Sequence, residues 1–581
     1  MERLRPSTRS SRARRVLLVI TIPVLLLACD ADPSEDEAEP QGPDDAGELE
    51  GPDIGEEHER DEQPDADASP EPPDDDEEEA PEPQGPGEFA VSAGDSDAVD
   101  AGIEVLEAGG SAVDAAIAAA YAVSVVEPFA SGIGGGGQTL VAAPDDAPQA
   151  YDYREVVAQD GQVPDSGAGI PGFVAGMEAL HEEYGELSWE ELLEPAVALA
   201  EEAETSTLLA ERLERASGRL PIEELDHLFP EGQPLGAGEP LVQEELASTL
   251  RGLRDDGASA FYEGALGEEL AGSVAGIDTG SLEAYDVQRS EPPSGAFAGY
   301  EVVGAAPPLP GSTLVQQLQI AESAGVGELD PASADAIHTV AMAWRAARSH
   351  IQWDLGDPEF VDVPTDEHTD ASRNEAIAEM TPADGLLPLD PAAPRDGIDP
   401  NTTHVTVVDA DGQVVSMTNT LTNFWGSGQY ASGYFVNDQL ARFSIGEGEA
   451  NVPEPGRRSV SWSLPAMVLD DDGRPVLGIG TPGGERIPNV LTQVLIRWAL
   501  HDEPLEEAVA APRYHLEGSR LQLEEPLDDA VADDLAGRGY EALEAQPALY
   551  FGSVQALEVG DDEVIGGRDA RREADWDAGS P

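Results

Sequence analysis

The chain contains a single cysteine, Cys29, and no lysine among its 581 residues. One thiol cannot form an intrachain disulfide, and it leaves no cysteine-based metal site. Its 30 Lys/Arg-type residues are therefore all arginine, and they face 118 acidic residues, which gives a net charge of -88. A surface of this charge repels nucleic acid and anionic lipid, so neither is expected as a partner. The lack of lysine is compatible with a saline habitat or with a GC-rich genome.

The first 28 residues have the pattern of an export signal. Several arginines precede an apolar run from Val16 to Ala28, which is too short to span a membrane comfortably. The run ends in Leu26-Leu27-Ala28-Cys29, which resembles a bacterial lipobox, where the cysteine is lipidated and becomes the first residue of the mature protein. An ordinary export signal with an incidental cysteine is the alternative. We expect an exported protein, lipid-anchored through Cys29 to the cell envelope on the periplasmic or cell-surface side.

Residues 29–87 are expected to form a disordered acidic tether. They consist mainly of Asp, Glu, Pro and Gly, and Arg60 is their only Lys/Arg-type residue. Such a segment cannot bury enough apolar surface to fold. We interpret it as a solvated spacer, because nothing in it supports a specific binding role. Residues 88–581 contain no second linker of this kind and are expected to form one compact unit.

The folded part changes character along its length. Helical patterns dominate before residue 400, where Ser111 and Asp114 form a predicted capping box, and strand patterns dominate after it. This mixture predicts an α/β or α+β fold in which helices cover the outer faces of sheets. Many prolines and acids between residues 359 and 401 predict an exposed loop. The predicted helices cover residues 98–108, 111–126, 174–184, 189–203, 241–255, 333–351 and 490–500, and the predicted strands 138–143, 300–304, 404–408, 414–420, 465–469, 476–480, 553–559 and 563–567.

A predicted hairpin begins at Asn401-Thr402-Thr403-His404. An alternating run leads to the turn Asp409-Ala410-Asp411-Gly412, and a second apolar run follows, so Thr402 is expected at the leading edge of the hairpin. If the Asn401–Thr402 bond were cut, the freed amine of Thr402 could act as the base for its own hydroxyl. An unperturbed α-amine titrates at about 7.7 to 8. Thr-Thr pairs are also ordinary in strands, so a threonine without a chemical role is the alternative.

The segment resembles the start of the small subunit in the γ-glutamyltransferase (glutathione hydrolase) family. The resemblance runs from about Phe89 to about Arg571 and implies a four-layer αββα sandwich of the N-terminal nucleophile hydrolase type. It also implies cleavage at Asn401–Thr402 into a large subunit, residues 88–401, and a small subunit, residues 402–581, without cofactor or metal. The other matching motifs, in the order of the family, are Gly132-Ile133-Gly134-Gly135-Gly136-Gly137, Tyr153-Arg154-Glu155, Gly169-Ile170-Pro171-Gly172, Leu355-Gly356-Asp357-Pro358, Thr481-Pro482-Gly483-Gly484 and Ala511-Pro512-Arg513-Tyr514-His515.

The resemblance also implies the catalytic residues. Thr402 is the expected nucleophile, and Thr420 matches a threonine whose hydroxyl contacts the nucleophile. Gly483 and Gly484 are expected to supply the oxyanion hole, because backbone amides in a glycine turn leave room for the substrate. A strand threonine at position 420 and a simple glycine turn at 483–484 are the structural alternatives.

Three residues match the acyl-binding positions of the family. Arg154 occupies the position of an arginine that binds the α-carboxylate of the glutamyl group, for which a planar guanidinium is suited. A solvated surface ion pair is the alternative for Arg154. Ser461 matches the first of two serines that assist this arginine, and Gln439 matches a residue near the substrate amine.

Three further positions depart from the family pattern. Arg442 replaces an aspartate that pairs with the substrate ammonium, and Trp462 replaces the second serine. Thr422 replaces an asparagine, with Asn423 displaced by one position. Reversal of charge at residue 442 would repel an ammonium. The resemblance as a whole implies a self-processed enzyme that acts on small γ-glutamyl amides such as glutathione, by hydrolysis or transpeptidation, although these departures weaken the match for the α-amine. The alternatives are an acylase for glutaryl-type amides without the α-amine, and a surface lipoprotein that has lost turnover.

Overall fold

The computed structural model describes residues 85–581 except 145, 217, 219, 389–399 and 445–449. The predicted signal segment, Cys29 and residues 30–84 of the tether lie outside this part of the chain. Within it, no helix combines the length and the apolar character needed to cross a bilayer.

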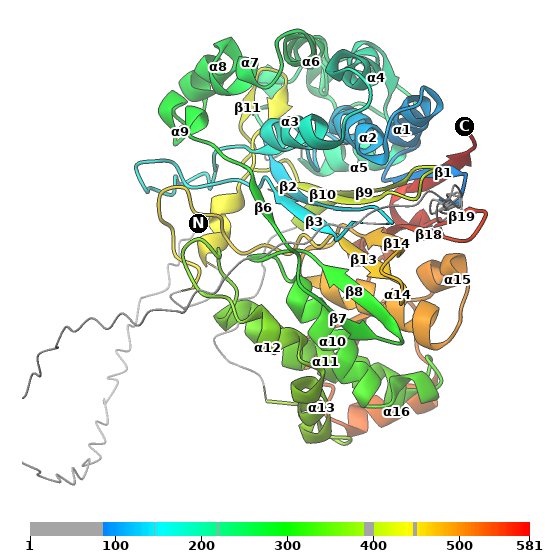
Figure 1. Cartoon of the computed structure of the whole chain (residues 1–581). Coiled ribbons are helices and arrows are strands. Elements are labelled where there is room, and N and C mark those ends of the chain that lie inside the picture. The colour runs from blue at the N-terminus through cyan, green and yellow to red at the C-terminus, as the bar shows by residue number, and fades with distance from the viewer. Residues whose placement is uncertain (1–84, 145, 217, 219, 389–399, 445–449) are drawn as a thin grey trace, which may run out of the picture. The chain divides into compact units, whose positions relative to one another are not determined.

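Two antiparallel sheets lie face to face at the centre of the fold (Figure 1). Strands of the two sheets contact each other, and Val408, Met467 and Leu557 belong to the apolar cluster that fills the space between them. In spatial order, the first sheet contains β20 (Asp575–Gly579), β1 (Phe89–Ala93), β9 (Pro400–Val408), β10 (Val414–Asn423), β2 (Gly136–Ala142), β3 (Gln149–Asp152) and β6 (Gln288–Ser290). The second contains β19 (Val564–Gly567), β18 (Gln555–Val559), β14 (Pro475–Gly480), β13 (Ala466–Leu469), β8 (Tyr300–Gly304) and β7 (Ser294–Phe297).

Helices cover the outer face of each sheet, which gives the αββα order of layers (Figure 1). Every residue of β10 is consequently buried, because one face of the strand meets the second sheet and the other meets α2. The helices on the first sheet are α1 (Ser96–Glu107), α2 (Ala112–Val126) and α3 (Phe173–Tyr184), with α4 (Trp189–Glu201) and α6 (Glu244–Asp256) packed beside them. The helices on the second sheet are α10 (Gly311–Ser323) and α14 (Ile487–Leu500), with α11 (Ala334–Trp353) packed against both.

Helix α2 shows how the sequence specifies this packing. The Ser111 hydroxyl accepts the Asp114 amide, and the Asp114 carboxylate accepts the Ser111 amide, each at 3.1 Å, which confirms the predicted capping box. Every residue of the helix is buried. Its many alanines let it approach both the first sheet and the neighbouring helices α1 and α4.

The predicted hairpin is confirmed, whereas the predicted loop is partly wrong. β9 and β10 pair antiparallel, and Gly412 in the turn between them has a φ of +85°. Residues 359–401, expected as a loop, contain α12 (Thr365–Thr369) and α13 (Ala371–Met380). The Asp370 carboxylate caps α13 by accepting the Arg373 amide at 2.7 Å. Packing of α13 against α10 stabilises a helix that its composition did not indicate.

Candidate active site

Thr402 lies in β9 at a β-bulge, two residues inside the strand rather than at its edge. Asn401 pairs with Thr422, and Thr403 pairs with Asn419, so Thr402 faces two residues of β10, Thr420 and Leu421. A bulge of this kind bends the strand and redirects side chains. Here it interrupts the regular pairing beside the Asn401–Thr402 bond. The alternation of apolar residues alone could not reveal this extra residue.

The hydroxyl of Thr420 links Thr402 to the carbonyl of the preceding residue. The Thr402 hydroxyl donates to Thr420 Oγ1 at 3.3 Å, and Thr420 Oγ1 donates to the Asn401 carbonyl oxygen at 2.8 Å. The amide of Thr422 also donates to Thr420 Oγ1, at 2.7 Å, and fixes this hydroxyl. Thr402 is 6% exposed and Thr420 is 1% exposed, so these contacts are shielded from water. The arrangement can polarise the carbonyl of the Asn401–Thr402 bond.

Close approach of β2 to Thr420 requires glycine. A Cβ atom on Gly135 would lie 2.3 Å from the Thr420 carbonyl oxygen, and one on Gly136 would lie 2.5 Å from the Tyr153 carbonyl oxygen. Both distances are too short for any side chain. The glycine run singled out in the sequence therefore packs directly against the strand that carries Thr420.

Two ionisable side chains that the sequence analysis did not identify lie beside Thr402. A small cavity is lined by Thr402, Glu127 and Arg572, among others. Thr403 Oγ1 donates to Glu127 Oε2 at 3.3 Å, and Arg572 donates to Asn401 Oδ1 at 2.7 Å. Burial raises the pKa of Glu127 to about 8 and lowers the pKa of Arg572 to about 9. No residue pattern in the sequence connects these two side chains, which lie 445 positions apart.

His404 follows the threonine pair but has a structural environment. Its ring nitrogens contact the hydroxyls of Thr418 at 2.7 Å and Thr406 at 3.1 Å. Burial lowers its pKa to about 3, so the imidazole is neutral at physiological pH. A Cβ atom on Gly480 would meet the ring at 2.2 Å, which shows that His404 packs closely against β14 of the second sheet.

Gly483 and Gly484 lie in the turn between β14 and α14, next to β9. Their φ angles of +147° and +60° are accessible to glycine at little cost. The short 3-10 helix η5 (Gly484–Arg486) contacts β9, and Pro482 lines the same small cavity as Thr402. This turn can present backbone amides beside the threonine.

Arg154 is fully buried and forms an ion pair, which excludes the solvated surface pair considered from sequence. Its Nε and Nη2 donate to the two carboxylate oxygens of Asp152 at 3.1 and 2.6 Å, and its Nη1 donates to the Ser459 carbonyl oxygen at 2.9 Å. Burial would raise the pKa of Asp152, but Arg154 and Arg458 outweigh it and hold the pKa below its usual value. These contacts occupy three of the five guanidinium N–H groups and leave two that can donate to another carboxylate.

Gln439 connects the threonine region to Arg154. Thr422 Oγ1 donates to Gln439 Oε1, and Gln439 Nε2 donates to Ser459 Oγ at 2.8 Å. Ser459 is the residue whose carbonyl accepts from Arg154. Thr422 itself has a φ of +82°, an unusual conformation for a β-branched residue, just beyond the bulge. The structure thus joins Thr402, Thr420, Thr422, Gln439 and Arg154 through one chain of contacts that includes Ser459.

The other two departures from the family pattern, Arg442 and Trp462, lie in different surroundings. Arg442 is buried in the 3-10 helix η4 (Gln439–Ser444). Burial raises the pKa of Asp438, and the Asn423 side chain and the charge of Arg442 offset part of this rise. Arg442 therefore has a negative partner nearby. Trp462 packs against Trp344, with ring centroids 6.5 Å apart, in the apolar core under the second sheet. Ser461 beside it is 5% exposed.

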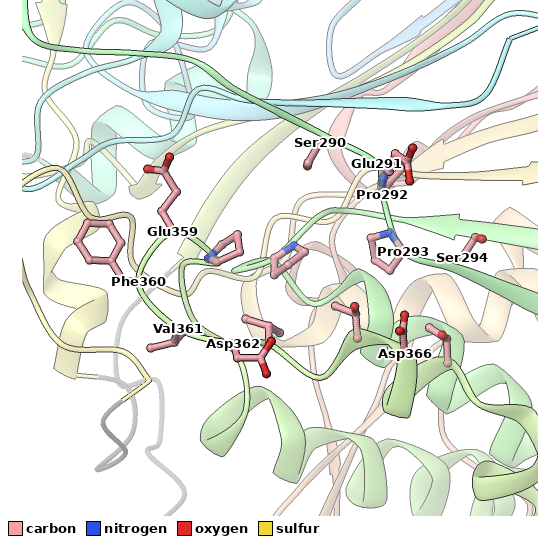
Figure 2. Close-up of a pocket in the computed structure, with 15 residues that line it drawn as sticks. Ser290, Glu291, Pro292, Pro293, Ser294, Glu359, Phe360, Val361, Asp362 and Asp366 are labelled. Carbon is pink, nitrogen blue, oxygen red and sulfur yellow. The ribbon is translucent and has the colours of Figure 1, made fainter. Parts of the chain in front are cut away.

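A wider pocket lies at the edge strands β6 and β7, and none of the predicted site residues lines it (Figure 2). Its walls come from residues 290–294, Pro307, residues 358–363, Thr365, Asp366 and Thr369. Acidic side chains from both segments line it, namely Glu291, Glu359, Asp362 and Asp366.

Comparison with proteins of known structure supports the fold. The chain aligns with the crystal structure of a cephalosporin acylase from Bacillus halodurans with a TM-score of 0.76 and 22% sequence identity. The alignment covers 87% of this chain and 99% of that chain. This similarity, together with the layers described above, confirms the predicted αββα sandwich.

Sequence comparison identifies the family. The chain is 36% identical over 498 residues to the capsule biosynthesis protein CapD proenzyme of Bacillus anthracis, covering 84% of this chain and 90% of that protein. It is 32% identical over 539 residues to the glutathione hydrolase proenzyme of Escherichia coli, covering 84% and 91%. It is also 32% identical over 503 residues to the acylase ACY 1 proenzyme of a Pseudomonas strain, covering 80% and 89%. The sequence pattern of the family described as Gamma-glutamyltranspeptidase matches residues 98–578, and the chain belongs to this family of enzymes.

Proposed function

We propose that this chain is a self-cleaving threonine amidohydrolase that transfers the acyl group of a γ-glutamyl or related amide through an ester on Thr402. The contact that carries the proposal is the hydroxyl relay from Thr402 through Thr420 to the Asn401 carbonyl. In maturation, Thr402 Oγ1 attacks this carbonyl, and Thr420 donates a hydrogen bond to the oxygen on which negative charge develops. The proton of the Thr402 hydroxyl passes to the peptide nitrogen, which leaves as the α-amine of Thr402. Water then hydrolyses the resulting ester, which releases the Asn401 carboxylate and restores the Thr402 hydroxyl.

In turnover, the freed amine accepts the Thr402 hydroxyl proton while Oγ1 attacks the substrate amide carbon. Amides of Gly483 and Gly484 stabilise the oxyanion, and the ammonium then returns its proton to the departing amine. Water or an acceptor amine attacks the acyl ester and releases Thr402. The environment of His404 supports the assignment of the α-amine as the base, because both ring nitrogens already contact Thr418 and Thr406 and burial lowers the pKa of the imidazole to about 3.

Arg154 is the proposed binding group for the terminal carboxylate of the acyl chain. Its contacts with Asp152 and with the Ser459 carbonyl fix the guanidinium and leave two N–H groups for a second carboxylate. Gln439 and Ser461 are proposed to complete this end of the site. Relatives named glutathione hydrolase support γ-glutamyl amides as one class of donor.

A second candidate is an acylase for amides whose acyl group lacks an α-amine. Arg442, at the position where the family usually has an aspartate, favours it because a guanidinium repels an ammonium. The named acylase relatives provide further support. Asp438 beside Arg442 opposes it, since its carboxylate could attract the ammonium instead. Trp462 gives little information on which acyl group is preferred, because its ring packs against Trp344.

The test of the shared chemistry is a single-turnover assay with γ-glutamyl and glutaryl anilides. Wild-type protein should form an ester on Thr402 with at least one of them, detected by mass spectrometry of the small chain. Absence of both product and adduct in a matured protein would overturn the proposal. We further propose that Cys29 carries the lipid that holds the enzyme at the cell envelope.

A further inference from the structure

Two histidines and an aspartate converge near the C-terminal end of α11, apart from the residues proposed for catalysis. His350 and Asp354 are four residues apart and therefore lie on the same side of the helix end. His368 comes from α12, which packs against α10. His350 Nδ1 lies 2.5 Å and His368 Nε2 lies 3.3 Å from the same oxygen, Asp354 Oδ2. The three potential ligand atoms all lie within 4.8 Å of one another.

We propose that His350, Asp354 and His368 bind one Zn²⁺ ion. Ligands of tetrahedral zinc are about 2.0–2.2 Å from the metal and hence roughly 3.3 Å from one another. His368 and Asp354 already have this separation. His350 Nδ1 lies closer to Asp354, at 2.5 Å, so the His350 ring would have to move to complete the ligand set. Two imidazoles favour zinc over Mg²⁺ and Ca²⁺, which take oxygen ligands. The ligand set requires no cysteine, so the single thiol of the chain does not exclude it.

Exposure of the cluster is suited to an ion that enters from solvent. The His368 side chain is fully buried, whereas those of His350 and Asp354 are 19% and 33% exposed. One side of the cluster is therefore anchored in the protein, and the other is open. A water molecule can occupy the fourth zinc position from the open side.

Surrounding side chains hold His368 in the orientation that a metal requires. His368 Nδ1 lies 3.1 Å from Ser312 Oγ, and its backbone carbonyl accepts the Asn374 side-chain amide at 2.7 Å. A neutral imidazole that binds zinc through Nε2 carries its proton on Nδ1, where the Ser312 hydroxyl can accept it. Hydrogen bonding of this kind fixes the tautomer and orients metal-binding histidines.

Zinc at this site would join the two ends of the segment between Asp354 and His368. Glu359, Asp362 and Asp366 of this segment line the pocket at β6 and β7 (Figure 2). Asp357 of the same segment accepts the Arg458 amide at 2.8 Å, and Arg458 contacts Asp152, the partner of Arg154. Because zinc would bind the folded site and not the unfolded chain, it should stabilise the fold.

The experiment is a titration of tag-free, EDTA-stripped full-length protein with ZnCl₂, followed by calorimetry and thermal unfolding. High salt and excess Mg²⁺ suppress nonspecific binding of Zn²⁺ to acidic side chains on the surface, so the titration measures selective binding. Wild-type protein should bind one Zn²⁺ per chain with a rise in Tm, and Co²⁺ in its place should give a visible absorption band. His350→Gln and Asp354→Asn should each weaken zinc binding at least about 100-fold and remove the band, and Ser312→Ala should weaken it about 10- to 100-fold.

His501→Gln is the matched control, because it removes a histidine outside the cluster and should bind zinc as the wild type does. Circular dichroism and Tm in EDTA establish that each variant is folded. If the wild type shows no saturable zinc binding under these conditions, the three side chains are held by hydrogen bonds alone and the proposal is overturned. Wild-type affinity and an unchanged Co²⁺ band in both His350→Gln and Asp354→Asn would equally overturn it.

Discussion

Thr402 donates a hydrogen bond to Thr420 within a β-bulge that places the two hydroxyls 3.3 Å apart. Thr420 in turn donates to the carbonyl of Asn401, the residue that precedes Thr402. The hydroxyl proposed to attack and the hydroxyl proposed to assist the attacked carbonyl are thus held in neighbouring strands of one sheet. Since both side chains are buried, little solvent reorganisation is needed when charge develops.

Replacement of Thr420 by valine should slow maturation. Valine keeps the shape of the side chain but cannot donate to the Asn401 carbonyl, and loss of one oxyanion donor costs about 10²–10³-fold in rate. The measurement is the appearance of the small chain over time after synthesis, followed by gel electrophoresis. Thr420→Ser keeps the hydroxyl and should mature much faster than the valine variant. Equal rates for wild type and Thr420→Val would exclude this role for Thr420.

Glu127 should set the pH at which the enzyme becomes active. Burial raises the pKa of Glu127 to about 8, and its ionised form near the Thr402 amine would favour the ammonium. Glu127→Gln should therefore lower the pKa of the amine and move the acid limb of kcat/KM to lower pH, by about half a unit. Glu155→Gln is the control, because burial also raises the pKa of Glu155 to about 8 but Glu155 does not line the Thr402 cavity. An acid limb that stays in place, or moves to higher pH, in Glu127→Gln would contradict this account.

Charge at residue 442 should control the choice between acyl groups. With Arg442 present, glutaryl anilides should be cleaved at least as well as γ-glutamyl anilides, compared by kcat/KM. Arg442→Asp should shift this ratio toward the γ-glutamyl donor by about tenfold, or about 1.4 kcal/mol. Asp438→Asn further distinguishes the two proposed functions. Loss of γ-glutamyl activity in this variant would identify Asp438 as the partner of the substrate ammonium. A strong wild-type preference for γ-glutamyl donors that Arg442→Asp leaves unchanged would show that Arg442 does not act in the pocket.

Local patterns were enough to predict much of the fold. The capping box at Ser111, the hairpin after His404 and the strand 300–304 depend on contacts between near neighbours, and the structure confirms all three. α12 and α13 were missed because prolines and acids around them indicate a loop, and packing against α10 overrides that tendency. The assignment of the layers depended on resemblance, since propensity does not determine how two sheets stack.

In the site, too, the sequence indicated residues within motifs but not the contacts between residues far apart in the chain. Motif matching singled out Thr402, Thr420 and Arg154, but not the charged side chains beside them. Asp152, which fixes Arg154, looks like an ordinary strand residue, although its position two residues before the arginine was a usable signal. Glu127 meets Thr403 across 276 positions. Such contacts exist only after the chain has folded, and a single sequence carries no trace of them.

Removal of the predicted lipid site should release the enzyme without affecting its chemistry. Cys29→Ser should shift the protein from the washed membrane fraction to the soluble fraction, with unchanged kcat/KM, because no proposed catalytic residue lies in residues 29–87. Measurement of activity in both fractions tests this directly. Continued sedimentation of Cys29→Ser protein with washed membranes would rule out Cys29 as the anchor.

The most direct test of the account is the intact mass of the purified protein, combined with amino-terminal sequencing of its smaller chain. Wild-type protein should contain a chain that spans residues 402–581 and begins with Thr402, because the base for turnover is the amine released by cleavage. Thr402→Ala should remain uncut, whereas Thr402→Ser, which keeps a hydroxyl, should still be processed. An uncut but active wild type, a smaller chain that begins at another residue, or cleavage of Thr402→Ala at the same bond would contradict the central role of Thr402.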